Sequence, residues 1–180
     1  MKIVSVVGMS GSGKSAVVGV FRDNGYTPVR FGDITDAEVK ESNLELDEAN
    51  ERQVREELRR KHGMAAYAIL SSPRIDAALK SSGVVIDGLY SWDEYVYLRK
   101  RYGNDLVVVA VCASPETRYA RLAGRKIRPL TAEEAASRDY AEIENLDKGG
   151  PIAMADFTII NESSLKDMQQ QVERIIAGIK

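Results

Sequence analysis

The chain has 180 residues, of which 44% are hydrophobic, and a formal net charge of −2. This length allows one domain with a proper core, the charge excludes a global basic field for nucleic acid, and no apolar stretch is long enough to cross a bilayer. Because no signal peptide is predicted and the single cysteine, Cys112, excludes an internal disulfide, we expect a cytoplasmic protein, a monomer or homodimer, that binds neither nucleic acid nor membrane.

The first predicted elements are a strand, a glycine-rich loop and a helix. Residues 3–7 are apolar and mostly β-branched, as in a buried strand, and residues 16–21 suit the core side of a helix. Between them, residues 8–15 read Gly-Met-Ser-Gly-Ser-Gly-Lys-Ser, the phosphate-binding pattern G-x-x-x-x-G-K-[ST]. A chance glycine-rich turn is the alternative, but both flanking elements that give the motif its meaning are present.

Each residue type in this loop has a chemical role toward a polyphosphate. The glycines let the backbone approach the phosphates, Lys14 reaches the β and γ oxygens, and the Ser15 hydroxyl can coordinate Mg²⁺. The helix N-terminus adds partial positive charge. We therefore predict a nucleoside triphosphate site formed by Gly8, Ser10, Gly11, Ser12, Gly13, Lys14 and Ser15.

The rest of the chain alternates between predicted strands and helices. Further strands are expected within 27–32, 83–88, 106–112 and 156–161, and helices over 47–62, 64–81 and 163–180, with Pro73 expected to break or restart the second of these. Capping signals at Ser91, Ser114 and Thr131 begin three more helices. Strands separated by helices imply right-handed parallel crossovers. The predicted fold is therefore α/β, a three-layer α/β/α sandwich with a five-stranded parallel sheet.

Polar residues follow the carboxyl ends of several predicted strands, where ligands gather in such sheets. They are Asp33, Asp87 and the pair Asn161-Glu162. Asp87 follows a Val-Val-Ile run, an arrangement in which a second motif supplies an acid to the Mg²⁺ shell. The alternative is a turn aspartate before a glycine. Beside a phosphate loop, the metal role is the favoured interpretation.

A run of cations follows the fourth predicted strand. Arginine forks suit the charge on a migrating phosphoryl group, and a closing flap would bring them in while expelling water. The alternative is a solvated helix face. The run holds no acid, and its members are Arg118, Arg121, Arg125, Lys126 and Arg128.

Three segments together resemble the P-loop nucleoside monophosphate kinases, adenylate kinase in particular. They are the phosphate loop, Val-Ile-Asp-Gly at 85–88 and Arg-Leu-Ala-Gly-Arg at 121–125. The resemblance spans most of the chain, is closest to the archaeal-type adenylate-kinase-related proteins, and extends to dephospho-coenzyme A kinases. It implies a P-loop NTPase fold in a single domain, 1–180, with an acceptor-binding helical insertion at about 33–80 and a short lid at about 124–140. ATP would be the phosphoryl donor and Mg²⁺ the cofactor.

The resemblance also implies roles for individual residues. In that family the first arginine of the R-L-x-G-R run stacks on adenine and the second contacts the phosphates, roles carried here to Arg121 and Arg125. Arg138 resembles the later lid arginine, and Asn161 lies in the loop beside the adenine. The predicted catalytic residues are Lys14, Asp33, Arg125, Arg128 and Arg138. The metal residues are Ser15 and, through water, Asp87.

The acceptor side departs from the family pattern. The two arginines that grip the acceptor phosphate in adenylate kinases correspond here to Asp36 and Ser91, and residues 33–51 are rich in acids. Compensation would have to come from Arg30, Arg52, Arg55 or Arg59. The expected function is a nucleoside monophosphate kinase. The alternatives are transfer to a hydroxyl, as in dephospho-coenzyme A kinase with Asp33 as general base, or a nucleotide-binding switch or ATPase.

Overall fold

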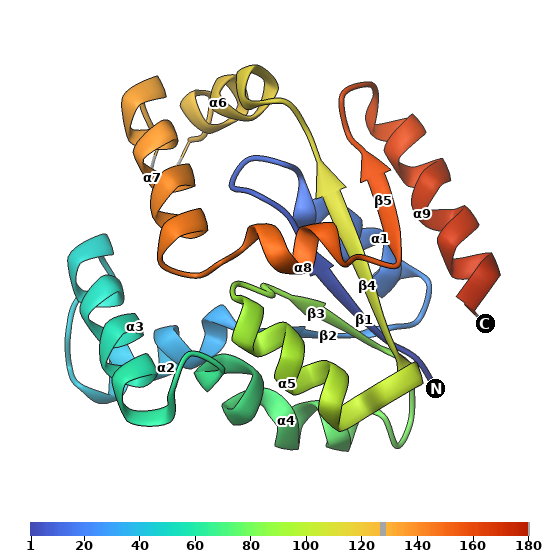
Figure 1. Cartoon of the computed structure of the whole chain (residues 1–180), viewed down its shortest axis with the longest axis horizontal. Helices are drawn as coiled ribbons and strands as arrows, with labels where there is room; N and C mark the ends of the chain where they lie inside the picture. Colours follow the sequence, from blue (N-terminus) through green and yellow to red (C-terminus); the bar gives the residue numbers. More distant parts are fainter. Residues whose placement is uncertain (127–128, 180) are drawn as a thin grey trace.

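Five parallel strands form the sheet that organises this protein (Figure 1). The computed structural model describes residues 1–126 and 129–179. The strands lie in the order β2-β3-β1-β4-β5, and every neighbouring pair is parallel. Their bounds are Ile3–Val7 for β1, Thr27–Arg30 for β2, Val84–Asp87 for β3, Leu106–Cys112 for β4 and Phe157–Ile160 for β5. The predicted α/β fold with a five-stranded parallel sheet is confirmed.

Helices cover both faces of this sheet and complete the three predicted layers. On one face, α1 (Lys14–Asp23) and α9 (Leu165–Ile179) pack on the strands through valines, isoleucines and Phe21. The other face is covered by α4 (Ala66–Ala78), α5 (Trp92–Tyr102) and α8 (Gly149–Ala153). The remaining helices are α2 (Gly32–Glu41), α3 (Glu48–His62), α6 (Pro115–Ala123) and α7 (Ala132–Glu144), with a 3₁₀ turn at Gly103–Asp105.

The central strand β1 determines where ligands can gather. It pairs with β3 on one side and β4 on the other, so the loop after β1 lies between the carboxyl ends of both. Val6 of β1 stands beside Asp87 of β3 in the register. Polar residues that follow these strands therefore meet at one edge of the sheet.

The predicted helix starts are present with their capping interactions. Ser91 and Thr131 each accept a hydrogen bond from the backbone of a glutamate three residues on, and that glutamate accepts one from the cap residue's backbone. The Ser114 side chain caps α6, whose first residue is Pro115. These pairs satisfy backbone N–H groups that a helix start leaves free.

The expected break at Pro73 is wrong, because α4 runs through it as one helix. Proline cannot donate to the carbonyl four residues earlier, which belongs to Ile69. Both Ile69 and Pro73 are exposed, so water can bond that carbonyl and the helix continues.

Two helices were not predicted from the sequence. Of α2, only Thr35 and Val39 are buried, so its acidic sequence has a weak apolar period. The five residues of α8 include two glycines and a proline, which gives no helical signal. Along the chain, α2, α3 and α4 lie between β2 and β3, over the range predicted for the acceptor-binding insertion. Across residues 1–126 and 129–179, no helix combines the length and apolar character that a membrane crossing needs.

Candidate functional site

The loop between β1 and α1 is shaped by glycines that no other residue could replace without strain. Gly11 and Gly13 have φ of 82° and 98°, in the left-handed region that favours glycine. A Cβ on Gly11 would come within 2.7 Å of the Arg118 carbonyl oxygen, and one on Gly13 would collide with the side-chain nitrogen of Asn161. The loop is therefore held against α6 on one side and the residue after β5 on the other.

Lys14 is folded over this loop. Its Nζ donates to the carbonyl oxygens of Gly8 at 2.8 Å and Met9 at 3.1 Å. Burial, together with the positive charges of Lys148 and Arg138, lowers the pKa of Lys14 to about 7, while the negative charges of Glu142 and Asp87 oppose the shift. An anion in the loop would favour the charged lysine, so the site is prepared for phosphate.

Three serines of the loop have different surroundings. The Ser10 hydroxyl donates to Glu142 Oε1 at 3.0 Å. The Ser12 hydroxyl is buried with no hydrogen-bond partner in the described part of the chain, while its carbonyl accepts from Asn161 Nδ2 at 2.8 Å. Ser15 is exposed in the first turn of α1. The Asn161 side chain is thus engaged in supporting the loop.

The two predicted aspartates differ in availability. Asp33 is paired with Arg30 at 3.2 Å and Arg74 at 2.9 Å. Asp87 is half-buried, and its carboxylate has neither a hydrogen-bond nor an ion-pair partner among the residues described. Burial raises the pKa of Asp87, while the charges of Lys14 and Arg30 oppose that shift.

Mg²⁺ fits this arrangement only together with a nucleotide. The exposed Ser15 hydroxyl and the Asp87 carboxylate, which is unpaired among the described residues, offer oxygen ligands at the edge of the loop. Within the described ranges, no group of three or more His, Cys, Asp or Glu side chains could hold a metal by itself. Phosphate oxygens and water would complete the shell.

The run of cations divides into different environments. Arg118 is buried and makes a two-pronged pair with Asp139, whereas Arg121 donates from Nη2 to the Asn161 carbonyl at 2.9 Å. The Arg125 side chain is largely exposed, and its pKa is lowered by partial desolvation of the guanidinium and by the charge of the neighbouring Arg138. A cation that a neighbouring cation destabilises in this way marks a place where an anion would be stabilised. The predicted Arg128 lies outside the described residues.

A buried ion pair that the sequence did not indicate lies beside the loop. Lys148 is 1% exposed, and its Nζ lies 2.8 Å from Glu142 Oε2. Burial alone would raise the pKa of Glu142, but Lys148, Arg138 and Lys14 lower it to about 2. Nothing in the local sequence singles out this lysine, because the segment that follows it has no helical period.

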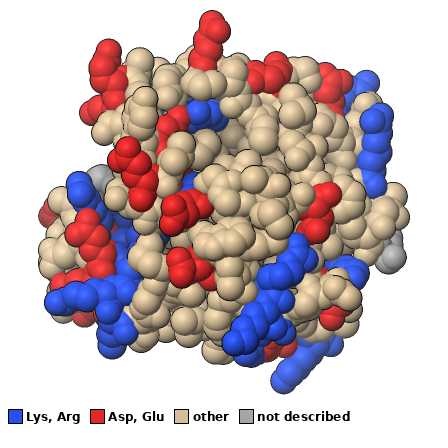
Figure 2. Space-filling model, in the orientation of Figure 1, with Lys and Arg blue, Asp and Glu red and all other residues tan. Residues whose placement is uncertain are grey.

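The segment predicted to bind the acceptor contains Arg59, an arginine with a distinctive position. The Arg59 guanidinium lies 5.4 Å from the Tyr67 ring centroid, and its Nε is buried without a hydrogen-bond partner in the described structure. Tyr67 in turn meets the Tyr90 ring edge-on at 5.9 Å. The other three candidates form ion pairs, Arg30 with Asp33 and Asp36, Arg52 with Glu56, and Arg55 with Glu51. Figure 2 shows acidic and basic side chains interspersed over the face in view.

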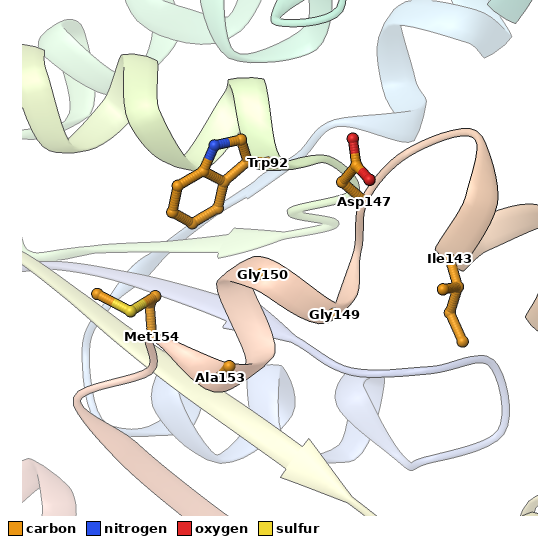
Figure 3. Close-up of a pocket in the computed structure, with 7 residues that line it drawn as sticks. All are labelled: Trp92, Ile143, Asp147, Gly149, Gly150, Ala153 and Met154. Carbon is orange, nitrogen blue, oxygen red and sulfur yellow. The ribbon is translucent and has the colours of Figure 1, made fainter.

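A hollow of about 440 Å³ lies beside α8 and contains none of the predicted site residues (Figure 3). Trp92 of α5 lines it and packs directly on the α8 backbone, where a Cβ on Gly150 would come within 2.6 Å of the indole. The other lining residues are Ile143, Asp147, Gly149, Ala153 and Met154. Its lining is mostly apolar, and the charged side chain among these seven residues is a carboxylate, so they offer a phosphate no cation.

Comparison with known proteins gives a family and a fold. Residues 4–145 match the family model described as an AAA domain. The UPF0200 protein of Thermococcus gammatolerans is 38% identical, with 98% of this chain and 97% of that protein covered. The UPF0200 protein of Hyperthermus butylicus is 34% identical, with 98% and 94% covered.

Two solved structures share the fold at low sequence identity. A gluconokinase from Sinorhizobium meliloti matches with a TM-score of 0.59 and 16% identity, covering 99% of this chain and 95% of that one. A shikimate kinase from Bacteroides thetaiotaomicron matches with a TM-score of 0.61 and 12% identity, covering 99% and 98%. The fold of this chain is therefore that of P-loop kinases.

Proposed function

The chain belongs to the UPF0200 family of AAA-domain proteins, and we propose that it is an ATP- and Mg²⁺-dependent kinase acting on a nucleotide-like small molecule, in the first place a nucleoside monophosphate. The observation that carries this proposal is the position of Lys14, whose ammonium folds over the glycine-rich loop near Asp87, a carboxylate without a partner in the part of the chain that the structure describes. This is the arrangement that phosphoryl transfer needs on the donor side.

Arg121, Arg125 and Arg138 supply further contacts to the phosphoryl donor, ATP, in this proposal. Arg121 lies against the Asn161 carbonyl, close to the loop, where it can contact the nucleotide base. Arg125, whose pKa the nearby charge of Arg138 lowers, and Arg138 itself would stabilise the phosphoryl group as it moves. Mg²⁺, held by Ser15 and through water by Asp87, would neutralise charge on the donor oxygens.

Arg59 and the two tyrosines support a nucleotide-like acceptor. A cation beside aromatic rings suits a molecule that has both a negative group and a planar base. Arg59 offers a buried Nε that still lacks a hydrogen-bond acceptor in the described structure. It can take the part that family arginines play at the positions of Asp36 and Ser91.

A second candidate function is transfer to a hydroxyl group, as in dephospho-coenzyme A kinase. An alcohol must lose a proton during transfer, whereas a phosphate acceptor need not. The Asp87 carboxylate, which has no partner among the described residues, favours this second function because it is free to accept the proton. Asp33 is less available as a general base, since Arg30 and Arg74 already bind it.

A coupled ADP-release assay over ribo- and deoxynucleoside monophosphates and dephospho-coenzyme A tests the proposal, with Lys14→Ala as the inactive control. Conversion of a monophosphate into a diphosphate would establish the first function. Activity only with dephospho-coenzyme A would establish the second. Phosphate release that no acceptor stimulates would instead identify an ATPase or switch, and absence of ATP binding would overturn both kinase functions.

A further inference from the structure

The Glu142 carboxylate joins three donors around the phosphate loop. Its Oε1 accepts from the Ser10 hydroxyl at 3.0 Å and lies 3.4 Å from Arg138 Nε. Its Oε2 accepts from Lys148 Nζ at 2.8 Å. The Arg138 and Lys148 donors lie close to Glu142 in the sequence, in α7 and just before α8, whereas the Ser10 donor comes from the phosphate loop, 132 positions away. The Glu142 carboxylate therefore links the phosphate loop, through Ser10, to Arg138 and to the buried Lys148.

These donors are the kinds of group that a terminal phosphate binds. A hydroxyl, a guanidinium and an ammonium form short, charge-assisted hydrogen bonds to phosphate oxygens as readily as to a carboxylate. Lys14 belongs to the same group, because the charges of Lys148, Glu142 and Arg138 all act on it. The Glu142 carboxylate thus accepts hydrogen bonds from cationic side chains that could equally well donate them to a triphosphate.

Lys148 is an unusual residue for a purely structural position. Burying an ammonium costs free energy that a single partner seldom returns in full, and an apolar residue of similar volume is often as stable. The same lysine also lies 5.7 Å from the Tyr90 ring centroid, on the acceptor side of the phosphate loop. It is thus placed between the donor loop and the residues proposed for the acceptor.

We propose that Lys148 is a second phosphate-binding lysine of this site, and that Glu142 is an internal anion that holds Lys148 until the terminal phosphate of ATP displaces the carboxylate. The inference rests on the proposed function, since it assumes that ATP occupies the loop. Repulsion between the carboxylate and a triphosphate drives the exchange, and Lys148 then contacts the phosphoryl group that is transferred.

Nucleotide affinity in the intact protein tests this without relying on turnover. The titrations use an unreactive ATP analogue and ADP, each with Mg²⁺. Glu142→Gln removes the competing charge and is expected to bind the ATP analogue about tenfold more tightly, as for one charge-assisted contact. ADP lacks the terminal phosphate and should show a much smaller change. Glu144→Gln, an exposed acid of the same helix, is the matched control and should change neither affinity.

Adding Lys148→Met to Glu142→Gln removes the lysine without leaving a buried charge unpaired. This double variant should lose the gain for the ATP analogue, with little effect on ADP. If Lys148 only anchors α8, Glu142→Gln will lower the melting temperature without tightening ATP binding, and that result overturns the inference. Equal ATP affinity in the double variant and Glu142→Gln also overturns it. Absence of nucleotide binding by the unmodified protein would instead refute the proposed function itself.

Discussion

Arg118 and Asp139 form a buried two-pronged ion pair that joins α6 to α7, with Nη1–Oδ1 at 2.9 Å and Nη2–Oδ2 at 2.6 Å. Arg118 Nη1 also donates to the Ser10 carbonyl at 3.1 Å. A movement of α7 is thereby linked to the shape of the phosphate loop. Arg118 therefore stabilises the phosphate loop from its buried position, although it belongs to the same run of cations in the sequence as the exposed Arg125.

Asp139→Asn should destabilise the protein by about 3 kcal/mol, because it leaves the buried Arg118 guanidinium without a counter-charge. Urea unfolding followed by circular dichroism measures the change. Asp23→Asn, which breaks the exposed pair with Arg22, is the control and should cost less than about 1 kcal/mol. Equal effects of the two changes would show that the buried pair contributes no more than a surface one.

ATP binding should take up protons at about pH 8. The pKa of Lys14 is lowered to about 7 in the free protein, and a bound triphosphate favours the charged form, so the ammonium gains a proton on binding and affinity falls as pH rises above about 7. Calorimetry in buffers with different ionisation enthalpies measures the uptake. Lys14→Ala should show none, and uptake that persists in this variant would assign the proton to another group.

Arg125→Ala and Arg121→Ala should affect different kinetic parameters. Arg125 is proposed to act on charge that develops during transfer, so its loss should lower kcat more than ATP affinity. Arg121 is proposed to contact the base equally before and during transfer, so its loss should mainly raise the KM for ATP. Steady-state kinetics at varied ATP separates the two. Unchanged kinetics in both variants would mean that this part of the run is a solvated helix face.

Arg59→Met should weaken AMP binding about ten- to a hundredfold, the value of one charge-assisted contact to a phosphate. The titration is made with an unreactive ATP analogue present. Arg52→Met is the matched control from the same helix, since Arg52 is exposed and paired with Glu56 at 2.9 Å. AMP affinity that is the same in both variants would remove Arg59 from the acceptor site.

Glu94→Gln should stabilise the protein at about pH 8 but not at about pH 4. Burial raises the pKa of Glu94 from 4.5 to about 7. The folded state therefore holds this proton more firmly, and stability falls as pH rises from 4.5 to about 7. Glutamine can still accept the hydrogen bonds from the Tyr90 and Ser91 backbone. Thermal melts across pH test this, and a parallel shift at every pH would contradict it.

The sheet and the phosphate loop could be predicted because their signals are local. Apolar β-branched runs, capping residues and the glycine spacing each act within a few positions of the chain. Lys148 and Glu142 are missing from the predicted site because their signal is not local. Their pairing depends on how the end of α7 and the start of α8 turn toward the loop. The sequence of this short, glycine-rich segment does not predict the direction of that turn.

The division of the arginine run shows the same limit. Arg118 and Arg125 both follow β4, and composition alone gives them one role. The first becomes buried because α7 returns an aspartate to it, which is a contact over 21 residues. Arg59 differs from Arg52 and Arg55 in the same way. It contacts Tyr67 of α4 and has a buried Nε, and both features arise from the way α4 packs beside α3.

The hydrogen bond from Asn161 to the Ser12 carbonyl has a consequence for biosynthesis, because it joins residues 149 positions apart. During synthesis the phosphate loop therefore leaves the ribosome well before Asn161, the residue after β5 that supports it. Until Asn161 arrives, the glycine-rich loop is free to adopt other conformations, since nothing restrains it from that side. We therefore expect the loop to reach its folded shape only after the fifth strand has joined the sheet.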